Sequence, residues 1–413
     1  EKAMARRFIE QSCRYWVEEY HIDGFRFDLM GLIDTETMTR ITEQVKAINP
    51  HAIVYGEPWG GYGSEILTGK GDQRGLGFAV FNDNIRNAIR GSTDGTDGGF
   101  AMGDENDKAA VIRGIEGSIN DFADDPTETI NYISAHDNYT WWDKLDHRYN
   151  PNETPPPHYP EETLRQMSRL GQSIVLTSQG IPFLHAGSEF LRTKRTGDPQ
   201  QDEETIRNSY AADDEVNKLD WQLRADNDDM VEYIKGLIAL RKARYEFRLG
   251  DRDSVIMALD FIDGLPNTAI AYTLADMTPA DDWGDLMVVH NAGSEGQAIS
   301  LPGGHWAQVV DGTQAGLEVL ATLVSSDVAP AVIEVPGRST AVFFQQAQPG
   351  VQLNFFQNTT LDAFLQLAVN ARNGAGEVTV TINGEDVPLT AQAAGTWTGS
   401  YEMTESGPLE ISV

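Results

Sequence analysis

Three acidic residues follow short apolar runs in the first third of the chain, and each has neighbours that could assist the cleavage of a bond. The first is Asp28, which ends the run Gly24-Phe-Arg-Phe-Asp28. Side chains alternate across a strand, so Arg26 and Asp28 should share one face while the two phenylalanines point to the other. An adjacent guanidinium favours the charged carboxylate that a nucleophile needs, although a purely structural ion pair would have the same sequence.

The second acid is Glu57, in the run Val54-Tyr-Gly-Glu-Pro-Trp59. An acid at a strand end, with an aromatic side chain two residues later, suits a general acid beside a platform on which a sugar ring can stack. A single glutamate at such a position also serves often as a helix cap or a surface residue. Its neighbours alone leave both interpretations open.

The third acid is Asp137, in the run Ser134-Ala-His-Asp-Asn138. Three aromatic residues follow closely: Tyr139, Trp141 and Trp142. His136 and Asp137 could hydrogen-bond neighbouring sugar hydroxyl groups while these aromatic side chains stack on the ring faces. Metal binding is the weaker interpretation, because two adjacent ligands without a third at helical spacing make a poor site.

Residues 1–247 alternate helical and strand-like patterns, and each acid stands at the end of a strand-like run. Strands are predicted at 24–30, 52–57, 77–81, 129–134 and 181–186. An amphipathic helix is predicted from the spacing of Met4, Phe8, Cys13, Trp16 and Tyr20, and further helices at 37–48, from 85, at 163–177 and at 229–245. Repeated strand–helix units imply a parallel sheet with helices outside, whose closed form is a (β/α)8 TIM barrel with its active site at the C-terminal strand ends. We therefore predict an α/β fold with about five C-terminal units of such a barrel.

Beyond residue 247 the pattern changes to short strands broken by Gly, Pro and Asn, which is typical of an antiparallel sandwich. Strand-like runs include Ser254–Leu259, Leu286–His290 and Ser339–Phe344. Gln345–Gly350 has the composition of a polar linker, and Glu377–Ile382 leads into Asn383-Gly384, a hairpin-type turn. The predicted domains are 1–247, the partial barrel; 248–346, an all-β sandwich; and 350–413, a small β module that could be incomplete.

Composition limits the partners. The 413 residues carry 63 acidic and 31 basic side chains, a net charge of −32. Such a field repels nucleic acid and anionic membrane surfaces but not a neutral polysaccharide. No apolar stretch is long enough for membrane insertion. The single cysteine, Cys13, excludes an intrachain disulfide framework, and we expect it to be a packed, inert thiol.

Taken together and in this order, GFRFD, YGEPW and SAHDN resemble the second, third and fourth signature blocks of the α-amylase superfamily (glycoside hydrolase family 13). Within it they most resemble type I pullulanase. Further segments agree with the resemblance: Val80–Arg86, Arg90–Gly95, Pro182–Gly187, Glu189–Arg192, Asn208–Tyr210 and Asn217–Trp221. The resemblance covers roughly residues 1–345.

The resemblance implies a role for each acid. Asp28 becomes the nucleophile, Glu57 the acid/base and Asp137 the carboxylate that stabilises the transition state, with Arg26 orienting Asp28 and His136 binding substrate. The implied enzyme is a retaining glycoside hydrolase that acts by double displacement. Its implied substrates are the α-1,6-glucosidic branch bonds of pullulan, amylopectin or glycogen-type glucans.

Several alternatives stay open. An α-1,4-acting amylase, an isoamylase-type debranching enzyme and a non-catalytic carbohydrate-binding protein would all fit an amylase-type barrel. No cofactor is required, but Asp94 and Asp97, in the Gly- and Asp-rich segment 91–103, are weak calcium candidates beside the simpler interpretation of a flexible rim loop. For location, the sequence favours a secreted or cell-surface protein over a cytoplasmic one without deciding between them.

One departure from the family concerns its first block, which ends in Asn-His on the third barrel strand. None of the eight histidines here follows an asparagine, and the chain opens on a helical pattern without an initiator Met. We therefore expect three barrel strands to lie upstream in a larger gene product. Because five-eighths of a barrel exposes open sheet edges, we expect this chain alone to be weakly stable or inactive unless an upstream segment completes it.

Overall fold

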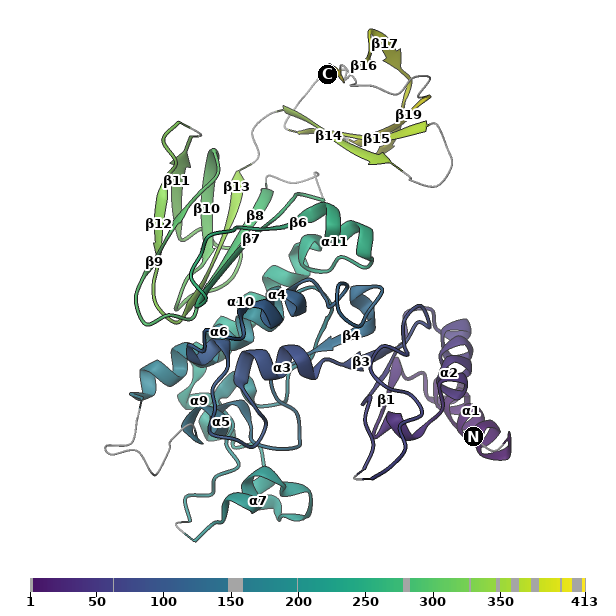
Figure 1. Ribbon diagram of the computed structural model, residues 1–413, viewed down its shortest axis with the longest axis vertical. Coiled ribbons are helices and arrows are strands. Elements are labelled where there is room, and N and C mark those ends of the chain that lie inside the picture. The colour runs from purple at the N-terminus through teal and green to yellow at the C-terminus, as the bar shows by residue number, and fades with distance from the viewer. Residues whose placement is uncertain are drawn as a thin grey trace.

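A parallel sheet of five strands occupies the N-terminal part of the molecule (Figure 1). The computed structural model describes residues 3–61, 63–147, 159–198, 200–277, 283–326, 328–346, 350–357, 364–372, 379–393, 396–402 and 411–412. The strands, neighbours in chain order, are β1 (Gly24–Phe27), β2 (Ile53–Gly56), β3 (Ala79–Phe81), β4 (Thr129–Asn131) and β5 (Ile181–Pro182). Every neighbouring pair runs parallel. Among the described residues, β1 and β5 are the two edges of this sheet.

Helices connect and follow these strands, as the alternating pattern predicts. They are α1 (Ala3–Tyr20), α2 (Thr35–Ile48), α3 (Asp83–Arg90), α4 (Lys108–Ile115), α5 (Trp141–His147), α6 (Glu161–Thr177), α7 (Glu203–Arg207), α8 (Asp214–Asn217), α9 (Trp221–Asp226) and α10 (Asp228–Ala243). Short 3-10 turns lie at η1 (Met30–Leu32), η2 (Phe100–Met102), η3 (Pro126–Glu128), η4 (Ser188–Phe190), η5 (Ser209–Ala211) and η6 (Tyr245–Phe247). The predicted fold class, a partial barrel followed by all-β parts, is confirmed.

The two faces of the parallel sheet bury different side chains. Val54 and Val80 belong to a cluster with the helical residues Cys13, Met38 and Ile41. The residues next to them in the chain, Tyr55 and Phe81, belong to a separate cluster that is rich in aromatic rings. This alternation follows from the two-residue period of a strand. It leaves one face for the covering helices and the other for the interior, beneath the strand ends that carry the acids.

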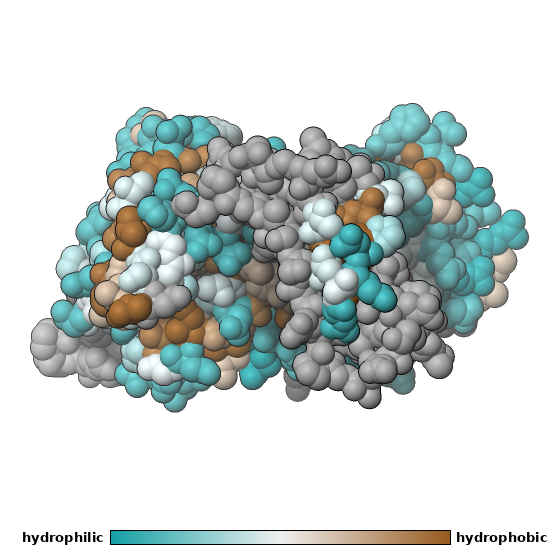
Figure 2. Space-filling model, turned by 90° about the horizontal axis from the view of Figure 1, so that it is seen from above, coloured by the Kyte–Doolittle hydropathy of each residue, from teal (hydrophilic) through white to brown (hydrophobic). Residues whose placement is uncertain are grey.

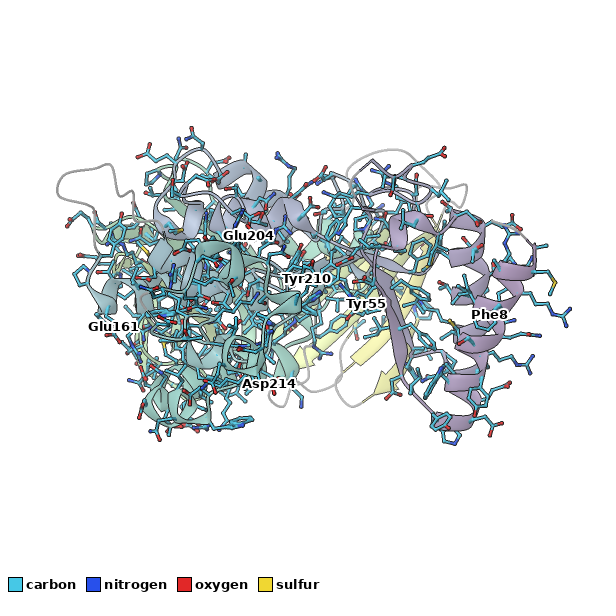
Figure 3. All side chains as sticks on the ribbon, turned by 90° about the horizontal axis from the view of Figure 1, so that it is seen from below. Phe8, Tyr55, Glu161, Glu204, Tyr210 and Asp214 are labelled. Carbon is cyan, nitrogen blue, oxygen red and sulfur yellow. The ribbon has the colours of Figure 1, made fainter. Side chains whose placement is uncertain are left out.

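Helix α1 forms where the sequence predicts it, but of the five apolar residues whose spacing predicted it only Cys13 is buried. Cys13 and Val17 are buried, and burial raises the pKa of the Cys13 thiol to about 11, as expected of an inert packed cysteine. Phe8 is 74% exposed and points away from the rest of the molecule (Figure 3). Other apolar side chains of α1 are also exposed: Met4, Tyr15, Trp16 and Tyr20. The helix packs on α2 through its 13–17 stripe, and no described element covers its aromatic stripe.

The predicted strand at Ser254–Leu259 is also wrong, because Ser254–Ala258 belong to helix α11 (Arg252–Ala258) and only Leu259 is in a strand. Asp251 caps this helix by accepting from the Ser254 amide and hydroxyl, each at 2.8 Å. Val255 and Ala258, three residues apart, are buried together. The cap and the helical spacing outweigh the strand preference of Val255 and Ile256.

The six-stranded antiparallel sheet that follows is covered on both faces. Its order is β11-β10-β13-β8-β7-β6, with β6 (Leu259–Phe261), β7 (Ala269–Leu274), β8 (Trp283–Asn291), β10 (Gly304–Val310), β11 (Ala321–Ser325) and β13 (Ser339–Gln346). One face packs on α6 and α10, with Val288 and Val342 in a cluster that includes Ile174 and Leu237. The other face packs on the two-stranded sheet of β9 (Gln297–Ser300) and β12 (Val332–Val335). Burial on both faces explains the uninterrupted apolar run of β13.

The C-terminal part forms two small sheets. They contain β14 (Gly350–Gln357), β15 (Phe364–Arg372), β18 (Leu389–Ala393) and β19 (Thr396–Glu402) in one, and β16 (Val380–Ile382), β17 (Glu385–Val387) and β20 (Ile411–Ser412) in the other. The predicted turn at Asn383-Gly384 is confirmed: both residues have positive φ, 50° and 82°, and join the antiparallel strands β16 and β17. The predicted linker is partly wrong, because Gln345 and Gln346 belong to β13 and Gly350 begins β14, while 347–349 lie outside the described residues. The boundaries of the three domains stay predictions.

The described surface is mixed. On the face seen in Figure 2, apolar side chains form separate patches among hydrophilic ones. Val324 and Val332, on outer strands of the sandwich, are among the exposed apolar residues. A search of the described helices finds none with the length and apolar character needed to span a bilayer.

Candidate active site

Asp28 and Glu57 come together because β1 and β2 pair in parallel and in register. Phe27 lies beside Gly56 in this pair. The next residue of each strand is one of the two acids, so both leave the sheet at neighbouring carboxyl ends. The Phe27 carbonyl accepts the Glu57 amide at 3.1 Å, which fixes the start of the loop after β2.

A single guanidinium group binds both acids. Arg26 Nη1 donates to Asp28 Oδ1 at 2.7 Å, and Arg26 Nη2 donates to Glu57 Oε1 at 2.5 Å. The other Glu57 oxygen accepts from the Leu29 amide at 2.8 Å. Leu29 has the left-handed conformation (φ 44°), which turns the chain after Asp28 back toward Glu57. The predicted pairing of Arg26 with Asp28 is present, and its second bond, to Glu57, is a feature that the separate motifs did not predict.

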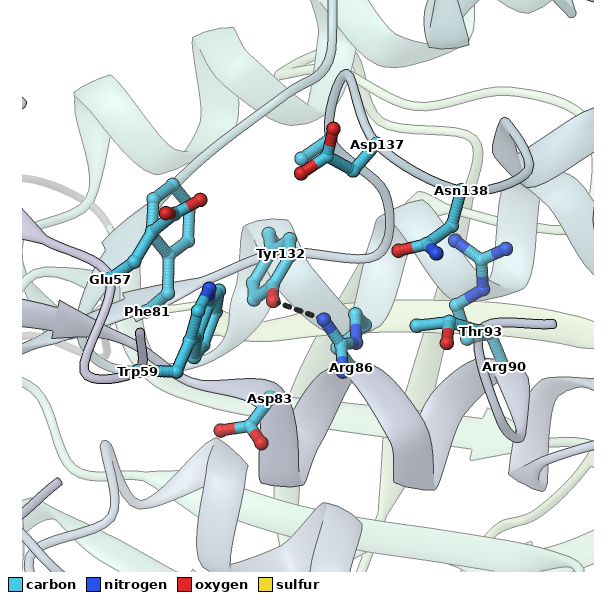
Figure 4. A pocket seen from close by; sticks show the side chains of 11 residues that line it. Glu57, Trp59, Phe81, Asp83, Arg86, Arg90, Thr93, Tyr132, Asp137 and Asn138 are labelled. Atoms are coloured by element: carbon cyan, nitrogen blue, oxygen red, sulfur yellow. Dashed lines mark hydrogen bonds between the residues drawn. The ribbon is translucent and has the colours of Figure 1, made fainter. Parts of the chain in front are cut away.

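Glu57 and Asp137 line one cavity of about 350 Å³. Figure 4 places their carboxylates on facing walls, with Trp59 beside Glu57. Asp137 stands on the loop that follows β4, and its side chain is 61% exposed. The neighbouring His136 lies 3.4 Å from it, between Nε2 and Oδ1. All three predicted acids therefore follow strands of one parallel sheet. Asp28 does not line the cavity itself, but Arg26 connects it to Glu57, which does.

Aromatic rings form the inner wall of the cavity. The Phe81 ring is the centre of this wall, with ring centroids of Tyr132, Phe183 and Tyr55 at 4.9, 5.3 and 5.5 Å. Trp59 lies at 6.3 Å from Phe81. Such rings offer apolar faces to a sugar, whose C–H groups stack on them. Of the three acids, Glu57 is the buried one, at 5% exposed.

Sequence reasoning missed the polar side chains on the other side of the cavity, where Asp83, Arg86 and Arg90 line it. Arg86 Nη1 donates to the Tyr132 hydroxyl at 2.6 Å (Figure 4). Burial raises the pKa of Tyr132, and burial followed by repulsion from Arg86 lowers that of Arg90 to about 9. Asp83 stands two residues after the end of β3, so a search for acids just beyond each predicted strand would have found it.

Two of the predicted stacking residues cannot stack on substrate here. Tyr139 and Trp141 are each 1% exposed. The Tyr139 hydroxyl donates to Glu203 at 2.8 Å, and Trp141 packs against α6, where Gly171 leaves room for its ring. Trp142 is half-buried and packs against the same core. The prediction placed these rings on the rim, whereas the short helix α5 turns Trp141 into the core.

The calcium candidates are engaged by hydrogen-bond donors. Asp97 accepts from the amide and hydroxyl of Ser92, and Lys144 Nζ lies 3.5 Å away. Burial acts to raise the pKa of Asp97, but these donors outweigh it and lower the pKa. Asp94 accepts from Asn138 Nδ2 at 3.0 Å. Within the described residues, no group of three or more His, Cys, Asp or Glu side chains is placed to hold a metal ion.

Comparison with known proteins agrees with these motifs. Residues 257–314 match the protein family described as "Pullulanase, all-beta domain". The chain is 35% identical over 314 residues to the pullulanase of Bacillus subtilis (strain 168), an alignment that covers 73% of this chain and 41% of that protein. Its structure is similar to that of the pullulanase from Bacillus acidopullulyticus, with a TM-score of 0.74, 39% identity and coverage of 83% of this chain and 40% of that one.

A second similar structure is a pullulanase from Anoxybacillus sp. LM18-11 complexed with maltotetraose, with a TM-score of 0.72 and 34% identity over 84% of this chain and 47% of that one. The chain spans less than half the length of each of these relatives. The resemblance to the α-amylase superfamily, and within it to pullulanases, is therefore confirmed.

Proposed function

We propose, from this resemblance to pullulanases of the α-amylase superfamily, that the chain carries the catalytic acids of a retaining hydrolase of α-1,6-glucosidic branch bonds. The observation that supports this most strongly is the Arg26 bridge. It joins Asp28 to Glu57, and Glu57 shares a cavity with Asp137. Pullulan, amylopectin and glycogen-type glucans are the proposed substrates.

In the proposed mechanism the bond between the anomeric carbon and the bridging oxygen breaks in two displacements. Glu57 gives its proton to the leaving oxygen while an Asp28 oxygen bonds to the anomeric carbon and forms a β-glycosyl ester. Glu57 then takes a proton from water, whose oxygen displaces Asp28 and restores the original configuration. One guanidinium bonding both carboxyl groups favours the short separation, about 5–5.5 Å, of retaining enzymes over the wider inverting arrangement.

The remaining side chains would bind and polarise the sugar. Asp137 faces Glu57 across the cavity, where its charge would stabilise the positive charge that develops on the sugar ring. His136, exposed beside Asp137, would bind hydroxyl groups, and Trp59 would stack on a ring face. The maltotetraose bound to the Anoxybacillus pullulanase is a ligand of the proposed class.

We also propose that further strands pair with the outer edges of β1 and β5, which no described strand pairs with. An apolar cavity of about 470 Å³ lies beside β5, with Ile181, Pro182 and Leu184 in its lining. Unpaired strand edges next to apolar surface are unfavourable in water. A segment that completes the barrel would fill this cavity and supply the remaining substrate contacts.

Chromatography of the products released from pullulan and from amylose tests the function. It should compare this chain, the chain with any sequence that precedes it in its gene restored, and a Glu57→Gln variant of each. We expect maltotriose from pullulan, intact amylose and no products from the variants. Cleavage of amylose would replace the α-1,6 preference with an α-1,4 one, and no cleavage of either glucan by the restored chain would contradict the enzymatic function.

A further inference from the structure

The loop that carries Asp137 is held by two buried cations that contact its main chain. Arg90 Nη1 and Nη2 donate to the carbonyl oxygens at the two ends of the loop, Ile133 at 3.0 Å and Tyr139 at 3.1 Å. Lys194 Nζ donates to the carbonyl oxygens on either side of Asp137, His136 at 2.7 Å and Asn138 at 2.8 Å. Arg90 comes from α3, whereas Lys194 follows η4, so elements far apart in the chain converge on this loop.

Lys194 is itself fixed in place. Its amide donates to Asp143 Oδ2 at 2.8 Å, and its carbonyl accepts from Gln201 Nε2 at 2.9 Å. Asp143 is fully buried and also accepts from the hydroxyls of Thr140 and Thr193. The main chain of Lys194 is therefore held in place, and its ammonium group in turn holds the two carbonyl groups to which it donates.

Placing a charged amine here is costly. Lys194 is 1% exposed, and burial lowers its pKa to about 8. The surrounding charges partly cancel: Asp143 and Asp137 favour the ammonium form, while Arg192 and Arg90 oppose it. Hydrogen bonds from a charged donor are roughly twice as strong as neutral ones. The stronger bonds to the two carbonyls offset the cost of burying the ammonium group.

The loop also contains a residue in the left-handed conformation. Asn138 has a positive φ of 61°, in a region that Asn adopts more readily than most residues other than Gly. Its carbonyl is bound by Lys194, and its side-chain amide donates to Asp94 at 3.0 Å. The backbone on the C-terminal side of Asp137 is thus shaped by Lys194 and one side-chain bond.

We propose that Lys194 is a positioning residue for Asp137. By binding the carbonyls before and after Asp137, its ammonium group sets the place of that carboxylate opposite Glu57. The proposal rests on the proposed function in so far as Asp137 acts on the transition state. Lys194 itself does not touch substrate in this role.

A double-mutant cycle tests the coupling. Lys194→Met should lower kcat on pullulan by roughly 10- to 100-fold with KM changed less than threefold, because a shift of about 1 Å at a catalytic group can cost 10²-fold. In an Asp137→Asn background the same change should cost less than about threefold, since the group it positions is already impaired. If the two losses multiply in the double variant, Lys194 does not act through Asp137 and the proposal is overturned.

Amide hydrogen exchange gives a second test that does not need activity. Exchange of a peptide spanning 134–140 should be roughly tenfold faster in Lys194→Met than in the wild type. The matched control is Lys108→Met, because Lys108 Nζ also donates to two main-chain carbonyls, Leu265 at 2.9 Å and Pro266 at 3.1 Å, away from the site. This control should leave exchange at 134–140 unchanged.

The exchange result separates the two hypotheses. If the chain with any preceding sequence restored cleaves no glucan, the proposed function fails, yet faster exchange in Lys194→Met than in the wild type still supports the positioning role. Unchanged exchange at 134–140 in Lys194→Met overturns it. Should Lys194→Met not fold, Lys194→Gln replaces it, because a neutral amide one bond shorter also removes the charged donor.

Discussion

The two walls of the candidate site are held by different means. On one wall, Asp28 and Glu57 follow the edge strand β1 and its neighbour β2 and share the side chain of Arg26, which is 27% exposed. This part, with α1 and α2, packs in a smaller apolar cluster that also includes Val80 and Phe122. We refer to residues 3–59 as the edge part.

On the other wall, Asp137 stands on a loop whose main chain is bound by buried cations. The loop leaves β4 and enters α5, which packs on α6 within the largest apolar cluster of the described residues, shared with the six-stranded sheet. We refer to α3, α5, α6 and the 133–139 loop as the core part. The difference indicates that damage to the edge part should appear in catalysis, whereas damage to the core part should appear first in stability.

The largest effect is expected from the acids of the edge part. Glu57→Gln keeps the shape of the side chain and removes its proton transfer, so kcat on pullulan should fall by roughly 10³- to 10⁴-fold with oligosaccharide binding largely kept. Glu18→Gln, an exposed acid on α1 that pairs with Arg14, is the control and should be neutral. Steady-state kinetics and calorimetric titration with maltotetraose measure both quantities. Near-normal turnover of Glu57→Gln would remove Glu57 from the mechanism.

The next effect is expected from the Arg26 bridge. Arg26→Met removes the partner of both carboxylates at once, and we expect kcat to fall by about 10²- to 10³-fold, the range for the loss of one preorganised donor. Because Arg26 is part-exposed, the midpoint of urea unfolding should change little. If Arg26→Met strongly lowered the free energy of unfolding and left kcat unchanged, Arg26 would have a structural role, and damage to the edge part would not appear first in catalysis.

Arg90→Met makes the matching change in the core part. Arg90 is 1% exposed, and its removal leaves the carbonyls of Ile133 and Tyr139 without this donor. Each buried acceptor left unpaired costs about 1–3 kcal/mol, so the loss of the donor to both carbonyls should lower the free energy of unfolding by roughly 2–6 kcal/mol. Urea unfolding followed by circular dichroism measures it. A change below about 0.5 kcal/mol, the size of an ordinary surface substitution, would mean that the loop is held by other contacts.

The edge part is also where the sequence predicted most. GFRFD and YGEPW place their acids at strand ends by local rules, and the parallel register of β1 and β2 then brings them together. The hairpin at Asn383-Gly384 was predicted for the same reason, since its turn chemistry is local. Even the Arg26–Asp28 contact follows from the two-residue period of one strand.

In the core part, the decisive contacts join residues far apart in the chain, and local patterns could not predict them. Lys194 reaches the Asp137 loop from 56 to 58 positions away in the sequence. The sequence placed Trp141 beside the substrate, whereas in the fold it packs against α6, where Gly171 leaves room for its ring. The helix α11 was missed because its cap at Asp251 outweighs a β-branched composition.

A pH dependence should arise where α6 of the core part packs on the six-stranded sheet, and not in the edge part. His290 is fully buried between Thr177 and Thr340, and burial lowers its pKa to about 3. The unfolded chain takes up this proton near pH 6.5, so stability is complete above that pH and falls as pH drops toward 3. The expected slope is at most about 1.4 kcal/mol per pH unit. His290→Gln should flatten the stability curve between pH 6.5 and 4; an unchanged slope would assign acid sensitivity to other groups.

The smallest effect is expected from a substitution on the exposed face of α1. This substitution tests whether that face is in contact with solvent in solution. Phe8→Gln changes a side chain that is 74% exposed and should alter the free energy of unfolding by less than about 0.5 kcal/mol. Val17→Ala, on the buried stripe of the same helix, removes two buried methyl groups and should cost about 1.5 kcal/mol. Urea unfolding of both variants gives the comparison directly. If Phe8→Gln costs as much as Val17→Ala, something covers the aromatic face of α1 in solution. The edge part would then be held, like the core part, by apolar packing.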